Sequence, residues 1–110
     1  MKLLFLCSQN VLRSPTAEAV FSVWPGIEAS SAGTDAEAEM PVSADLIEWA
    51  EVVLVMETHH RRKIEARFPE LLREKRVVVL GIPDNYEYMD PELVELLKTK
   101  VTQSLKIERA

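Results

Sequence analysis

Short apolar runs alternate along the chain with segments in which apolar residues recur every three or four positions. The apolar runs predict buried strands at residues 3–6, 27–31, 52–56 and 77–80. Helical spacing follows each run, at residues 14–24, 44–50, 58–67 and from Asp90-Pro91 onward. Such alternation is typical of an α/β protein, here a three-layer sandwich whose four-stranded parallel sheet is flanked by helices.

The predicted helices carry local start signals and apolar faces. Ser14 is a suitable cap for the first helix, and Pro15 suits its first turn. Asp90 and Pro91 offer the same pair of signals to the last helix. The expected buried faces consist of Ala17, Val20, Phe21 and Trp24 in the first helix, Ile64 and Phe68 in the third, and Leu93, Leu97 and Val101 in the last.

The composition narrows the class of protein. The 110 residues, 47% hydrophobic and 28% charged, predict a single domain spanning residues 1–110. No apolar run is long enough to span a bilayer, and the apolar start is too short for a secretory signal, so we expect a cytoplasmic protein without a membrane partner. The net charge of −5 argues against nucleic acid as a general partner. We interpret the basic cluster at residues 61–63 as a solvated helix face.

Cysteine and histidine usage excludes several kinds of site. Cys7 is the one cysteine, so the chain can form no internal disulfide and no multi-cysteine metal centre. The two histidines, His59 and His60, are adjacent and therefore diverge on a helix, which makes them poor joint ligands. We expect neither a metal nor another cofactor.

The segment after the first predicted strand carries the candidate chemistry. It reads Cys7-Ser8-Gln9-Asn10-Val11-Leu12-Arg13-Ser14 and joins a strand to a helix N-terminus, which attracts anions. Successive N–H groups of residues 8–13 would surround phosphate oxygens. The same positive field favours the nucleophilic thiolate form of Cys7. Arg13 would bind the phosphate through two N–H groups. A lone cysteine after a strand is also a common core residue, and the spacing alone leaves that alternative open.

Three ordered segments resemble the low-molecular-weight protein tyrosine phosphatases. They are the opening Leu4–Cys7 with Asn10, Arg13-Ser14-Pro15 and residues 17–21; Ser31-Ala32-Gly33-Thr34; and Val53–Glu57. The resemblance implies a phosphomonoester hydrolase, in particular a protein tyrosine phosphatase, with a phosphocysteine intermediate on Cys7. It implies that Arg13 binds phosphate, that Asn10 and Ser31 support the loop, and that Ser14 donates to the sulfur. Substrates would be phosphorylated proteins or small aryl phosphates, and inorganic phosphate would be the product.

The family uses an aspartate after the last strand as general acid and base, and the chain offers two candidates. Asp90-Pro91 matches the family dipeptide, but capping of the last helix explains it fully. Asp84 lies closer to the strand, and Tyr86 follows two residues later, so we favour Asp84. Tyr86 and Tyr88 are the candidates for a wall against a substrate ring.

Three departures from the family pattern affect the expectations. Leu12 stands where many relatives carry a second cysteine, which predicts an oxidation-sensitive enzyme. The chain is a short variant, and its acidic stretch between Thr34 and Ala44 contains no aromatic wall. In the family an aspartate usually follows the third strand, where it supports the loop. Glu57 takes its place here, and its extra methylene puts that contact with a loop amide in doubt.

Two alternatives share the predicted loop and stay open at this point. One is an arsenate reductase that uses external thiols, because an internal cysteine relay is absent. The other is a non-catalytic module that binds phosphate or another anion. Phosphocarriers of sugar transport also phosphorylate such a cysteine, but they need neither the acid aspartate nor the Arg-Ser-Pro exit.

Overall fold

The computed structural model describes residues 1–110 and contains one four-stranded parallel sheet. Its strands are β1 (Lys2–Cys7), β2 (Glu28–Gly33), β3 (Val52–Val55) and β4 (Arg76–Val79). They lie in the order β2-β1-β3-β4, and each neighbouring pair is parallel. All four predicted strands are confirmed, with ends displaced by one or two residues.

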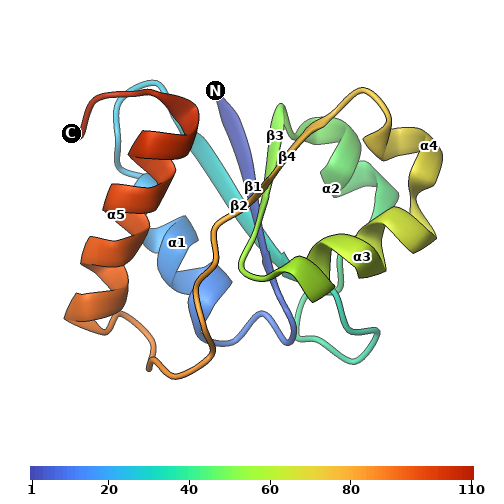
Figure 1. The fold of residues 1–110 in the computed structure, drawn as a ribbon, viewed down its shortest axis with the longest axis horizontal. Coiled ribbons are helices and arrows are strands. Elements are labelled where there is room, and N and C mark those ends of the chain that lie inside the picture. Colours follow the sequence, from blue (N-terminus) through green and yellow to red (C-terminus); the bar gives the residue numbers. More distant parts are fainter.

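Helices cover both faces of the sheet (Figure 1). One face carries α1 (Arg13–Phe21) and α5 (Pro91–Leu105). The other carries α2 (Ala44–Trp49), α3 (Thr58–Arg67) and the short α4 (Pro69–Leu72). The predicted three-layer α/β sandwich is therefore confirmed.

Strand β1 lies at the centre of the molecule and supplies both halves of the core. Alternate side chains of a strand point to opposite faces. Phe5 and Cys7 accordingly pack on the side of α1 and α5, whereas Leu4 and Leu6 pack on the side of α2 and α3. Each large apolar side chain buried in this way stabilises the fold by roughly 1.5–3 kcal/mol. The core therefore fixes the position of Cys7 at the end of β1.

The first helix departs from the prediction at both ends. It begins at Arg13, and its N-cap residue, Leu12, makes no side-chain capping bond. Ser14 lies inside the helix, so the prediction that it caps the helix is wrong. The helix also ends at Phe21, before Trp24, although Trp24 remains buried edge-on against Phe21 with 4.7 Å between ring centroids.

After α3, the structure contains one helix that the sequence did not predict, α4, and one that it did, α5. Phe68 is half-buried at the end of α3, and Pro69 then starts the four-residue α4, which is too short to show periodicity in the sequence. Asp90 caps α5 as predicted, and its carboxylate accepts a hydrogen bond from the Glu92 N–H (2.9 Å). The predicted apolar face of α5 is fully buried. No helix combines the length and apolarity required to cross a membrane.

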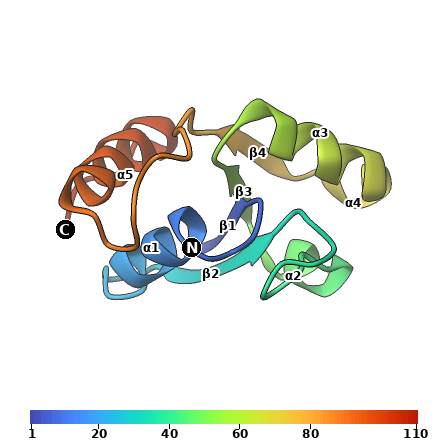
Figure 2. The same ribbon diagram turned by 90° about the horizontal axis from the view of Figure 1, so that it is seen from below.

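The carboxyl ends of the parallel strands meet at one edge of the sheet. Figure 2, seen from below, shows the loop after β1 at this edge, beside the segment after β2 and the start of α3. In such sheets ligands bind outside the carboxyl ends of the strands. This edge is therefore where the candidate site is expected.

Candidate active site

The backbone of Cys7 and of the loop that follows it, residues 8–12, is held through carbonyl groups, whereas the N–H groups of residues 8–12 stay free. Backbone N–H groups after β2 donate to three carbonyls: Thr34 to Cys7 (2.8 Å), Asp35 to Ser8 (3.0 Å) and Glu39 to Gln9 (3.1 Å). None of the backbone N–H groups of residues 8–12 donates a hydrogen bond within the protein. Converging free N–H groups form a concave site for an anion.

Gly33 allows this close approach of β2 to the loop. A Cβ at position 33 would lie 2.6 Å from the Ser8 carbonyl oxygen and 2.4 Å from Ala38 Cβ. Neither the loop backbone nor Ala38 can withdraw cheaply, so a side chain at position 33 would displace the loop that follows Cys7.

Asn10 holds the middle of the loop in a left-handed conformation, with a φ of 58°. Its side-chain amide donates to Ser14 Oγ (3.0 Å) and to Ser31 Oγ (2.9 Å). Ser31 in turn donates to a carboxylate oxygen of Glu18 (2.6 Å). The structure thus brings Asn10, Ser14 and Ser31 together; Glu18, which sequence reasoning missed, completes the chain of hydrogen bonds.

Cys7 lies at the base of the loop and is 3% exposed. Its Sγ is 2.9 Å from Ser14 Oγ. Because Ser14 accepts from Asn10, its own proton is available to the sulfur; the other acceptor in reach, the Ala32 carbonyl, is farther away at 3.4 Å. The Ser14 hydroxyl is therefore placed to donate to a thiolate.

Arg13 is 2% exposed, and both of its hydrogen bonds within the protein come from Nη1. Its Nη1 donates to Glu57 Oε1 (2.5 Å) and to the Ile82 carbonyl (2.8 Å). These two bonds use both protons of Nη1. The Nε and Nη2 edge makes no hydrogen bond within the protein and has the exposed Asp84 carboxylate 3.6 Å from Nε. The hydrogen bond and charge of Arg13 lower the pKa of Glu57 below its ordinary value, against the opposing effect of burial. Glu57 therefore has a clear partner despite its extra methylene.

Asp84 stands at the rim of a cavity of about 290 Å³, which is lined by Cys7, Ser8, Gln9, Val11, Leu12, Arg13 and Asp84. The Asp84 side chain is 62% exposed, and its Oδ1 is 3.6 Å from Arg13 Nε. Asp90 is not among the lining residues and is engaged in capping α5. The geometry thus brings Asp84, and not Asp90, to the candidate nucleophile loop.

The two tyrosines lie outside the lining of this cavity. Tyr86 is half-buried against the core, and Tyr88 is 54% exposed. Their role as a wall for a substrate ring stays a prediction. Val11, which is 47% exposed, supplies an apolar surface in the lining itself.

His60 connects α3 to the loop. No pattern in the sequence predicts this contact. Its Nδ1 accepts from the Glu57 backbone N–H (3.0 Å), and its Nε2 lies 2.9 Å from Ser8 Oγ. Burial, followed by the positive charges of His59 and Arg13, lowers the pKa of His60 from 6.5 to about 4. His60 is therefore neutral at physiological pH.

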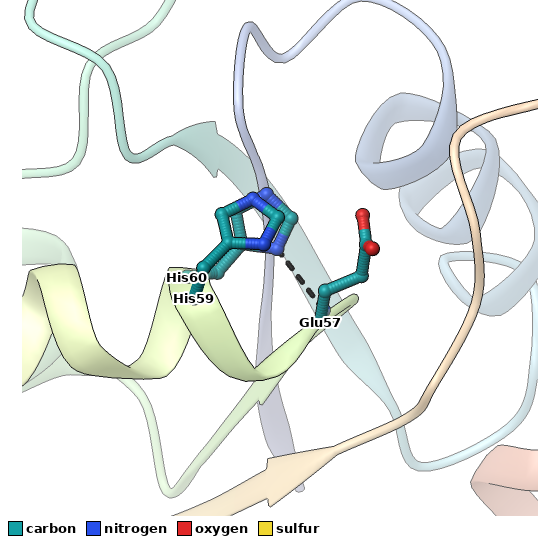
Figure 3. A group of neighbouring side chains, drawn as sticks. All are labelled: Glu57, His59 and His60. Atoms are coloured by element: carbon teal, nitrogen blue, oxygen red, sulfur yellow. Dashed lines mark hydrogen bonds between the residues drawn. The ribbon is translucent and has the colours of Figure 1, made fainter.

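Glu57, His59 and His60 form a group whose ligand atoms lie within 4.8 Å of one another. In Figure 3 the two rings overlap, one in front of the other, and the Glu57 carboxylate lies to one side of them. Both nitrogens of His60 are already hydrogen-bonded, and the Glu57 carboxylate binds Arg13. A metal at this group would have to break these bonds, so the donor set is a poor one.

A second contact between α3 and the loop involves charged side chains. Gln9 Nε2 donates to Asp35 Oδ2 (2.5 Å), and Lys63 also donates to Asp35. The hydrogen bond from Lys63 lowers the pKa of Asp35. Lys63 is therefore more than part of a solvated face, whereas Arg61 makes only an exposed pair with Glu65 (3.3 Å).

No protein-family model matches the sequence, and no curated protein matches it either. Solved structures do match. The YwlE arginine phosphatase from Geobacillus stearothermophilus superposes with a TM-score of 0.74 at 25% identity, over 96% of this chain and 92% of that one. The tyrosine phosphatase Wzb from Escherichia coli K30, in complex with phosphate, gives 0.74 at 22% identity over 96% of both chains. Vibrio vulnificus Wzb with benzylphosphonate gives 0.75 at 23%, over 96% of this chain and 97% of that one.

This chain has the low-molecular-weight phosphatase fold. The resemblance drawn from its sequence motifs is thereby confirmed at the level of the fold. The phosphatase fold places Cys7 at the end of the central strand, next to the cavity that Arg13 and Asp84 line.

Proposed function

We propose that this protein hydrolyses phosphate monoesters, with aryl phosphates such as phosphotyrosine as its substrates. One observation carries the proposal. The same cavity is lined by a cysteine, by a loop with free backbone N–H groups, by a buried arginine and by an aspartate. The phosphatases with which it shares the fold support the same chemistry.

The first chemical step transfers the phosphoryl group to sulfur. The Cys7 thiolate attacks phosphorus, an S–P bond forms, and the ester P–O bond breaks. Asp84 gives its proton to the departing oxygen. The loop N–H groups and the Nε and Nη2 edge of Arg13 stabilise the charge on the equatorial oxygens.

The second step regenerates the enzyme. Asp84, now ionised, takes a proton from water, the water oxygen attacks phosphorus, and the S–P bond breaks. The Ser14 hydroxyl donates to the departing thiolate, and inorganic phosphate leaves. Asn10 and Ser31 act indirectly, because they hold Ser14 and the loop in place.

The aryl preference rests on the apolar lining. Val11 offers a surface against which an aromatic ring packs, and it has no group that would hydrogen-bond a guanidinium. The acidic segment after β2 repels an anionic substrate less than its carboxylates alone would, because Lys63 neutralises Asp35. Tyr86 and Tyr88 remain candidates for the other wall.

The test is hydrolysis of p-nitrophenyl phosphate by the wild type and by Cys7→Ser. We expect turnover in the wild type only, with a phosphothiol trapped by rapid quench. A wild type that binds phosphate without turnover would support a non-catalytic anion-binding module instead. A panel of phosphotyrosine, phosphoserine and phosphoarginine peptides then decides the substrate class.

The assignment of the acid has its own test in Asp84→Asn and Asp90→Asn. Loss of the acid slows alkyl phosphates, whose leaving groups need protonation, more than activated aryl phosphates. We expect this selective loss in Asp84→Asn. Its appearance in Asp90→Asn alone would show that the assignment is wrong.

A further inference from the structure

We propose that His60 is a positioning residue that turns the Ser8 hydroxyl into an additional donor to the bound phosphoryl group. The proposal rests on the proposed function, because it assigns a further contact to the same phosphate site. It adds a side-chain donor to a loop in which only backbone N–H groups and Arg13 have been assigned to the phosphate.

The proton positions follow from the partners of His60. The Glu57 backbone N–H can only donate, so His60 Nδ1 must be the acceptor (3.0 Å). A neutral imidazole with an unprotonated Nδ1 carries its hydrogen on Nε2. The Nε2–H group therefore donates to Ser8 Oγ, 2.9 Å away.

This assignment determines what Ser8 can do. A hydroxyl that accepts from His60 still has its own proton to donate. Ser8 Oγ has no other hydrogen-bond partner in the protein, and Ser8 lines the cavity together with Cys7 and Arg13. An oxygen of a phosphate in this cavity is the acceptor that completes the geometry.

His60 also joins this donor to the arginine. Its Nδ1 fixes the backbone of Glu57, whose carboxylate holds Arg13 (2.5 Å). His60 is fully buried, so packing holds its ring in place. One neutral side chain thus sets two phosphate-binding groups that come from opposite ends of the loop.

Two pairs of substitutions test the proposal. Ser8→Ala removes the hydroxyl, and Ser8→Thr keeps it. His60→Asn keeps an acceptor near the position of Nδ1 but cannot reach Ser8, whereas His60→Gln places an amide donor near the position of Nε2. His59→Asn, at the exposed neighbouring ring, is the matched control. Orthophosphate affinity is measured by calorimetry, together with kcat and KM for p-nitrophenyl phosphate and the melting temperature.

We expect Ser8→Ala and His60→Asn each to weaken phosphate binding on the order of tenfold, the size of one hydrogen bond to a charged group. We expect Ser8→Thr and His60→Gln to recover most of the affinity, and the Ser8→Ala/His60→Asn double variant to be no weaker than either single one. A loss of thermal stability in His60→Asn without loss of phosphate affinity would mark a merely structural residue and overturn the proposal.

Unchanged phosphate affinity in Ser8→Ala, or losses that multiply in the double variant, would equally overturn it. If His60→Asn does not fold, the comparison of Ser8→Ala with Ser8→Thr decides the point. Calorimetry needs no turnover, so the proposal about Ser8 fails separately from the proposed function, which fails when the wild type does not hydrolyse the ester.

Discussion

At the scale of single residues, the candidate site depends on side chains that hold other groups of the site in place. Asn10 holds a left-handed backbone with two hydrogen bonds, and Glu57 holds the buried guanidinium of Arg13. Asn10 thus fixes the conformation of the loop backbone, and Glu57 fixes the orientation of the Arg13 side chain. Preorganised donors of this kind are the main source of electrostatic stabilisation in catalysis.

Replacement of Asn10 separates backbone strain from hydrogen bonding. Asn10→Gly keeps access to a φ of 58° but loses both bonds, whereas Asn10→Ala loses the bonds and adds strain. We expect Asn10→Ala to be less stable than Asn10→Gly by about 1 kcal/mol. Urea unfolding of the two variants measures the difference. Equal stability would contradict the strain argument.

Replacement of Glu57 tests how firmly Arg13 must be held. Glu57→Gln removes the negative charge from the contact with Arg13, whose length is 2.5 Å. We expect kcat/KM to fall roughly tenfold. This is the low end of the range for a hydrogen bond to a charged group, because the Glu57 side chain is 34% exposed. Glu57→Asp keeps the charge and the N-cap position of α3 and serves as the matched variant. Steady-state kinetics decide; wild-type kcat/KM in Glu57→Gln would show that Arg13 orients itself.

At the scale of elements, the sequence predicts strands and α5 well because each long element has its own periodicity or cap. The misses depend on contacts that form only in the folded chain. Ser14 has the sequence signature of a helix cap, but its hydroxyl forms hydrogen bonds with Cys7 and Asn10 instead. His60 looks like a surface histidine beside His59, and only the packing of α3 against the loop gives it two partners. The contact between Ser8 and His60 joins residues 52 positions apart, so it leaves no local pattern in the sequence.

The burial of His60 in α3 predicts acid lability. Its pKa is about 4 in the folded state and 6.5 without burial, so the unfolded state binds more protons between these values. The stability contributed by neutral His60 is present above pH 6.5 and is lost as the pH falls toward 4, by roughly 3 kcal/mol in full. The groups that act on the ring are His59, Arg13, Lys63 and Glu57.

The measurement is urea unfolding at pH 7 and pH 5. The depressed pKa values of Asp35 and Glu57 keep both carboxylates ionised at pH 5, so they do not mask the effect. We expect the wild type to lose stability between the two pH values and His60→Gln to lose much less. The same loss in both proteins would show that another group titrates.

At the scale of the whole molecule, the parallel sheet brings together residues that are far apart in the sequence. It gathers at one edge a thiol near the start of the chain and a carboxylate near position 84. The loop motif predicted Cys7 and Arg13 because they are close in sequence. Asp84 carries no such local signal, because only the folded chain brings it to the loop, whereas Asp90 stays at the start of α5.

The whole chain also sets its response to oxidants. With one cysteine, no internal disulfide can protect an oxidised Cys7, so peroxide carries it through sulfenic to sulfinic acid. We expect brief exposure to be reversed by thiols and prolonged exposure to leave a large irreversible fraction. Activity after dithiothreitol and the mass of the intact protein measure the two fractions. Full recovery after prolonged exposure would contradict the prediction.

The solitary thiol has a practical consequence as well. An alkylating reagent that reaches the cavity finds one thiol per molecule, so incorporated label counts reactive Cys7 residues directly. Protection by orthophosphate during labelling would report occupancy without any coupled assay. Under the proposed function, such labelling titrates the active site, and turnover numbers can be expressed per functional molecule instead of per milligram.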